Sequence, residues 1–133
     1  MIAMADEEVR EGLLYTDTHE WVRISGNTAV VGITDHAQKE LTDIVFVELP
    51  ELGKKINKGE ELCVVESVKS VSEIYAPLSG KITKINKDLE EAPETINESP
   101  YDKGWLVELE LTDKGEVKEL LDAEAYQTIV ASS

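Results

Sequence analysis

The chain has 133 residues, the length of one domain, and its 28 acidic against 13 basic side chains give a formal net charge of −15. This charge argues against binding to nucleic acid or to anionic membranes, which attract the opposite sign, and no apolar run is long enough to span a bilayer. The charge either directs the protein toward partners with basic surfaces or only keeps it soluble.

Residues 1–12 read as a frayed, acidic N-terminal extension, and residues 13–133 as the folded domain. The extension matches neither a secretory signal nor a transit peptide, so a cytoplasmic location is expected. The single cysteine, Cys63, falls in a predicted strand, where a small buried hydrophobe is expected rather than a reactive thiol.

The first half of the domain reads as a hairpin, a helix and a strand. Glu20–Ile24 and Thr28–Ile33 are strand-like on either side of a Ser-Gly-Asn turn, which predicts a hairpin. The spacing of Asp35 and Gln38 is that of a capping box, which predicts a short helix through Leu41. The apolar run from Asp43 to Leu49 predicts a strand that ends at Pro50.

A second predicted hairpin occupies the middle of the chain and has a lysine at its tip. Its strands are Glu61–Glu66 and Val71–Tyr75, and a proline follows them. Val68 and Lys69 supply none of the glycine, asparagine or aspartate that a tight turn prefers. The rest of the segment fits a hairpin, and only the composition of its turn does not. Such a local exception marks a candidate functional site.

The C-terminal part adds two strands, Lys81–Ile85 and Gly104–Leu111, separated by an acidic loop, Asp88–Ser99, with room for one helical turn. Two short helices end the chain. One is expected to be capped by Asp113 with Glu116 and to place Val117, Leu120 and Leu121 on one face, and the other places Tyr126, Ile129 and Val130 on one face. About seven short strands with helical additions predict a small, mostly-β sandwich or barrel.

The sequence offers little catalytic equipment. His19 and His36 have no metal-ligand spacing, and no nucleophile or phosphate-binding motif is present. Serines and glutamates surround Lys69 and favour a charged, hydrated amine, whereas a Schiff-base lysine needs a lowered pKa. We therefore expect no catalytic residue and no metal, and we expect Lys69 to be modified by another enzyme. These residues alone leave the modification open among lipoyl, biotinyl and none.

Several motifs, in one order, carry a resemblance over Tyr15–Ile129. They are Thr18-His19-Glu20-Trp21, Val31-Gly32-Ile33-Thr34-Asp35-His36-Ala37, Val45-Phe46-Val47-Glu48-Leu49-Pro50, Glu66-Ser67-Val68-Lys69, Ala76-Pro77-Leu78-Ser79-Gly80, Ile96-Asn97, Pro100-Tyr101 and Gly104-Trp105. In them the chain resembles the H proteins of the glycine cleavage system. The resemblance implies a barrel-sandwich hybrid, the flattened β-barrel of lipoyl and biotinyl domains, with short flanking and C-terminal helices, over residues 13–133.

The resemblance also implies a lipoyl carrier without catalysis of its own, with lipoate amide-linked to Lys69. Such a carrier takes the aminomethyl group of glycine from a pyridoxal-phosphate-dependent glycine decarboxylase to a tetrahydrofolate-dependent aminomethyltransferase, and dihydrolipoamide dehydrogenase reoxidises it. A monomer is expected. Glu66, Ser67, Val68 and Ser70 are expected to be recognised by the lipoate-attaching enzyme. Glu20, His19 and Glu73 are expected to line a cleft that holds the loaded arm, unless they are ordinary surface residues.

Three other functions compete with this one. Biotin carriers have the same fold class. The acceptor lysine of a biotin carrier stands between methionines, however, and the only methionines in this chain are Met1 and Met4. A lipoate donor or relay for other lipoyl-dependent complexes has the same sequence features. A non-lipoylated interaction module would not need the intact Glu66–Lys69 motif.

Overall fold

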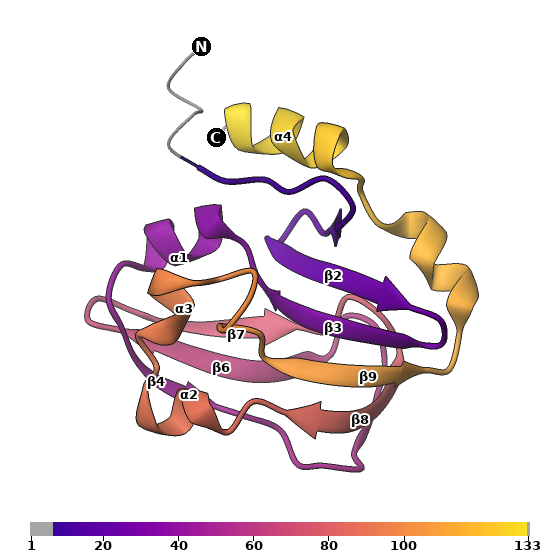
Figure 1. Ribbon diagram of the computed structural model, residues 1–133, viewed down its shortest axis with the longest axis horizontal. Helices are drawn as coiled ribbons and strands as arrows, with labels where there is room; N and C mark the ends of the chain where they lie inside the picture. The colour runs from indigo at the N-terminus through magenta and orange to yellow at the C-terminus, as the bar shows by residue number, and fades with distance from the viewer. Residues whose placement is uncertain (1–6, 133) are drawn as a thin grey trace.

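The computed structural model describes residues 7–132, and its strands form two antiparallel sheets (Figure 1). The larger sheet has six strands in the order β1-β2-β3-β9-β8-β5, and the smaller has three in the order β4-β6-β7. The strands of the larger sheet are β1 (Leu14–Tyr15), β2 (Glu20–Ser25), β3 (Thr28–Ile33), β5 (Lys55–Ile56), β8 (Gly80–Ile85) and β9 (Val107–Leu111). Those of the smaller sheet are β4 (Ile44–Glu48), β6 (Glu61–Ser67) and β7 (Val71–Tyr75).

The main core lies between the two sheets. Val31, Ile82 and Leu109 of the larger sheet share one buried cluster with Val47 and Val65 of the smaller sheet. Burial alternates along β9 and along the first four residues of β8, as expected for strands with one face on a core. The expectation of a mostly-β fold with the barrel-sandwich arrangement is confirmed. The two strands that the sequence analysis missed, β1 and β5, are only two residues long.

Short helices flank the sheets, namely α1 (Asp35–Leu41), α2 (Asp88–Glu91), α3 (Thr95–Glu98), the 3₁₀ helix η2 (Lys114–Glu119) and α4 (Ala123–Ala131). The prediction of one helical turn in the acidic loop is wrong, since that loop holds both α2 and α3. Leu89 and Ile96, which are fully buried, anchor one turn each, with Pro93 between them. No helix among residues 7–132 is long and apolar enough to cross a membrane.

The N-terminal caps of two helices differ from those predicted from the sequence. The cap of α1 is Thr34, whose hydroxyl accepts the N–H of Ala37 at 3.2 Å, so the expected capping box at Asp35 is wrong. Asp113 does cap the next predicted helix, which is 3₁₀ rather than α. The carboxylate of Glu116 does not complete that cap, because it accepts hydrogen bonds from the N–H and the hydroxyl of Ser79.

An aromatic cluster joins the N-terminal segment and α4 to the larger sheet. Both segments lie beyond strand β2 of that sheet (Figure 1). Tyr15 and Tyr126 stack at 4.5 Å between ring centroids, and Trp21 packs over Gly32, where a Cβ atom would lie 2.5 Å from the indole. Arg10 makes a bidentate pair with Asp102 at 3.0 Å. The expectation of a frayed extension is therefore wrong for residues 7–12, whereas residues 1–6 lie outside the described residues. The division into residues 1–12 and 13–133 stays a prediction.

Candidate functional site

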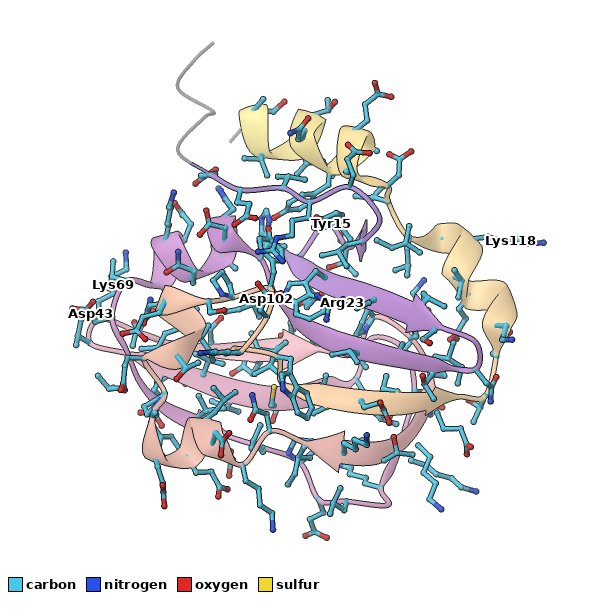
Figure 2. All side chains as sticks on the ribbon, viewed as in Figure 1. Tyr15, Arg23, Asp43, Lys69, Asp102 and Lys118 are labelled. Carbon is cyan, nitrogen blue, oxygen red and sulfur yellow. The ribbon has the colours of Figure 1, made fainter. Side chains whose placement is uncertain are left out.

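Lys69 projects from the tip of the β6–β7 hairpin, at one end of the molecule (Figure 2). The last paired residues of the hairpin are Glu66 and Val71, so the connection comprises the four residues Ser67–Ser70. A four-residue connection does not need the positive φ angles of a two-residue turn, and neither Val68 nor Lys69 has one. This explains how the hairpin closes without the glycine or asparagine that the sequence lacks at this point.

Ser67 holds the connection together from inside. Its N–H donates to the carbonyl of Ser70 at 2.8 Å, and its hydroxyl accepts the N–H groups of Ser70 at 3.1 Å and Lys69 at 3.3 Å. The Ser67 side chain is buried, whereas Val68, Lys69 and Ser70 are exposed. The backbone of Lys69 is therefore fixed, while its ammonium makes no ion pair or hydrogen bond within residues 7–132.

The corner before β4, which consists of Thr42 and Asp43, is hydrogen-bonded to this connection. The carbonyl of Asp43 accepts the N–H of Val68 at 3.0 Å, and the side chains of Asp43 and Lys69 lie at the same end of the molecule (Figure 2). The preceding residue, Thr42, has φ 65° and ψ −148°, a conformation that strains any residue with a side chain. Asn97 of α3 holds the corner, since it donates to the Thr42 carbonyl at 2.8 Å and accepts the N–H of Ile44 at 2.9 Å.

A groove of about 210 Å³ lies between α1, β7 and the segment before β2. Two of the three residues predicted for a cleft, His19 and Glu73, line it together. Its lining also includes residues that the sequence analysis missed: Thr18, Ile33, His36, Ala37, Glu40, Leu41, Ser72 and Ile74. The helical spacing of His36 with Glu40 and of Ala37 with Leu41 was the available signal, because residues four apart share one face of α1.

The third predicted residue, Glu20, does not line this groove. Its side chain is only 2% exposed, and one carboxylate oxygen accepts the hydroxyls of Thr16 and Thr18, both at 2.6 Å. The N–H of Tyr75 donates to the same carboxylate. Burial raises the pKa of Glu20, although these three hydrogen bonds oppose the shift. Glu20 is therefore already bonded within the chain.

The rings of the two histidines lie 4.5 Å apart between centroids and are tilted by 40°. Nδ1 of His19 lies 2.7 Å from the hydroxyl of Tyr126, which lies 2.7 Å from Oγ1 of Thr34. Burial, and next the neighbouring His36, lower the pKa of His19. Nδ1 of His36 lies 3.0 Å from a carboxylate oxygen of Glu7, so the N-terminal segment contacts a residue of the groove wall.

No cluster of three or more histidine, cysteine, aspartate or glutamate side chains able to hold a metal occurs in residues 7–132. Cys63 is buried, as predicted, and this burial raises the pKa of its thiol. A thiol in this state is a poor nucleophile.

Comparisons with known proteins agree on one family. A family model described as "Glycine cleavage H-protein" matches residues 13–133. A glycine cleavage system H protein of Staphylococcus saprophyticus is 53% identical over 118 residues, which cover 89% of this chain and 94% of that protein. A probable glycine cleavage system H protein of Thermococcus gammatolerans is 51% identical over 134 residues and 99% of both chains. The crystal structure of a glycine cleavage system H protein from Mycobacterium marinum superposes with a TM-score of 0.86 at 38% identity, covering 92% of this chain and 99% of that one.

Proposed function

The chain belongs to the glycine cleavage H-protein family, whose members are lipoyl carriers in glycine cleavage, and we propose that Lys69 is the residue that carries the lipoyl group here. The observation that supports this is the presentation of Lys69. Its amine is exposed and free of partners among residues 7–132, while Ser67 and Asp43 fix the backbone beneath it. An attaching enzyme needs such a reachable amine, and a carrier needs a rigid root for its arm.

The residues present fit a lipoyl group. Glu73 lies four residues beyond Lys69, roughly 13 Å along a strand. An extended lipoyl-lysine side chain has about a dozen bonds and reaches roughly 14 Å at the advance per bond of an extended chain. The apolar walls of the groove, Ile33, Leu41 and Ile74, suit a hydrocarbon arm. We infer that the carboxylates of Glu73 and Glu40, which also line the groove, hold a protonated amine at the end of that arm.

We further propose that the chain passes the aminomethyl group of glycine from the decarboxylase to the aminomethyltransferase and is returned to its oxidised form by dihydrolipoamide dehydrogenase. The lipoyl group, when bound, supplies the disulfide and dithiol chemistry of this cycle. The chain's own residues present the group, exclude water from part of it and bind partners. As a carrier component of glycine cleavage, the protein has a non-catalytic role. The monomeric state and the cytoplasmic location stay predictions.

A second function, donation of lipoate to other lipoyl-dependent complexes, uses the same exposed Lys69 and needs no other feature of the fold. The two functions differ in which enzymes accept the carrier. An assay that supplies the lipoylated chain to glycine decarboxylase and, separately, to an enzyme that moves lipoyl groups between proteins compares them directly.

The proposal is tested on protein from the native host grown on glycine. We expect intact-mass and peptide analysis to find one lipoyl group, on Lys69, and glycine decarboxylation to be restored when this chain completes a reconstituted system. Lys69→Arg should keep the fold and abolish both results, because a guanidinium does not form the amide. Lys81→Arg, at an exposed strand lysine, is the control. An unmodified Lys69 in an active carrier would refute the proposal.

A further inference from the structure

Four large apolar side chains stay exposed around Lys69. Val45, Phe46, Val68 and Val71 are 53%, 50%, 66% and 61% exposed, and we call these four residues the apolar face. Phe46 pairs with Glu66 across β4 and β6, and Glu66 pairs with Val71 across β6 and β7. Directly paired residues of an antiparallel sheet project on the same side. Phe46 and Val71 therefore belong to one surface of the smaller sheet, next to the turn that holds Val68.

A β-bulge places part of this face outside. The register of β4 against β6 shifts between Ile44 and Phe46. Ile44 and Val47 point into the core, and the two residues between them, Val45 and Phe46, are both exposed. With unbroken alternation, the residue two positions from Ile44 would also be buried. The bulge turns Phe46 outward instead, and bulges commonly re-aim side chains next to functional sites.

Carboxylates surround the apolar face. Glu48, Val64 and Glu73 form the next row of paired residues on the same surface, and Glu66 lies between Phe46 and Val71. Asp43 contributes another exposed carboxylate at the corner beside Val68. Strands β4, β6 and β7 contain no lysine or arginine. Glu66 itself lies within the apolar face, and we call the flanking carboxylates of Asp43, Glu48 and Glu73 the acidic rim. An apolar centre with a charged rim is the usual composition of a protein interface.

We propose that the apolar face and its acidic rim form the docking surface for the enzyme that acylates Lys69, and that this enzyme presents an apolar patch bordered by lysine and arginine. This inference rests on the lipoylation of Lys69 proposed above and names the surface that is recognised. A second copy of the chain is disfavoured as the occupant, because each copy has a net charge of −15 and an identical acidic rim.

The acylating enzyme depends on this surface more than the later partners do. It meets Lys69 before any arm exists, so only the surface around the lysine can be bound. Enzymes that act later receive the arm in their active sites and gain affinity from it. The recognition residues expected from the sequence, Glu66, Ser67, Val68 and Ser70, lie within or beside this surface, and Phe46 and Val71 extend it across the sheet.

The test measures lipoyl transfer to the unmodified full chain by a purified lipoate-attaching enzyme. Lipoyl-AMP is the donor: its acyl–phosphate bond breaks, an amide forms with Nζ of Lys69, and AMP and a proton leave. The double variant Phe46→Ser/Val71→Ser is expected to raise KM for the chain at least tenfold with kcat changed less than twofold. Leu52→Ser removes an equally exposed apolar side chain from the loop that pairs with β8 instead, and should leave KM within twofold.

The acidic rim is tested by charge and salt. Glu48→Gln/Glu73→Gln should raise KM several-fold at low ionic strength and lose this effect at high ionic strength, since exposed charges are screened by salt. If the double variant unfolds at a much lower temperature than wild type, Val45→Ser is measured in its place. Val45 belongs to the apolar face but is not paired across the strands, and its replacement should also raise KM. A KM of the Phe46→Ser/Val71→Ser chain within twofold of wild type would overturn the docking surface alone. Failure of the wild-type chain to accept lipoate would overturn the proposed function as well. A wild-type dimer that this variant dissociates would show that the face joins two copies, and would also overturn the inference.

Discussion

The carbonyl oxygen of Asp43 accepts the N–H of Val68 at 3.0 Å, and this bond joins the corner before β4 to the connection that presents Lys69. The corner itself contains the strained backbone of Thr42. Strained residues persist where neighbouring contacts over-determine them. Here Asn97 supplies those contacts, with a donor 2.8 Å from the Thr42 carbonyl, a donor 2.9 Å from Oε1 of Gln38 and an acceptor 2.9 Å from the N–H of Ile44.

Asn97→Ala should therefore lower the free energy of unfolding by about 2–3 kcal/mol, since three hydrogen bonds are lost, two of them part-buried. It should also slow lipoylation of Lys69, because the corner no longer supports Val68. Urea denaturation and the transfer assay measure the two effects. Asn57→Ala, which removes an exposed asparagine side chain from a turn, is the matched control. Equal stability of the two variants would contradict the role assigned to Asn97.

The carboxylates of the groove can be tested on the loaded carrier in the absence of partners. Glu73→Ala should speed the release of formaldehyde and ammonia from carrier loaded by glycine decarboxylase several-fold, because the amine is no longer held away from water. Adding Glu40→Ala should increase the rate further. Ammonia release is followed after removal of the decarboxylase, with Glu90→Ala, on the exposed side of α2, as the control. An unchanged rate in the double variant would exclude the groove as the binding place of the amine.

A variant of Glu20 can distinguish whether this residue stabilises the fold or binds the loaded arm. Its carboxylate is buried and accepts both threonine hydroxyls before any arm is attached. Glu20→Ala should lower the unfolding free energy of the unmodified chain by about 1–3 kcal/mol, since the hydrogen bonds of this carboxylate to the half-buried Thr16 and the exposed Thr18 are lost. Thermal or urea denaturation measures this against Glu110→Ala, an exposed strand residue. A stable Glu20→Ala chain that releases its load rapidly would instead support the role expected from the sequence.

The fold and the modified lysine were predictable because both are local in the sequence. Strand alternation, Pro50 and the motif around Lys69 indicate their structures without reference to distant residues. The groove was not predictable in the same way, since it forms where α1 meets β7 and the segment before β2. Glu20 illustrates the difficulty: Glu20, Trp21 and Val22 are all buried, because the start of β2 is covered on both faces. Alternation therefore could not tell which side of the strand Glu20 occupies.

His19 should make stability depend on pH near neutrality. Its pKa is lowered from 6.5, first by burial and next by His36, so the folded state disfavours the protonated imidazole. A group whose folded pKa is depressed contributes stability that is present above its unfolded pKa and is lost as the pH falls through the folded value. The chain should therefore lose stability as the pH is lowered below about 6.5.

His19→Asn should reduce this dependence, which urea denaturation between pH 7.5 and pH 5.5 measures in both proteins. Asparagine is the suitable replacement because His19 has φ 73°, and asparagine tolerates that region better than most residues. His19→Gln serves as the comparison: it should be less stable at every pH through backbone strain, while showing the same reduced dependence. If His19→Asn kept the full wild-type slope, the pH dependence would have to arise from groups other than the imidazole that faces Tyr126 and His36.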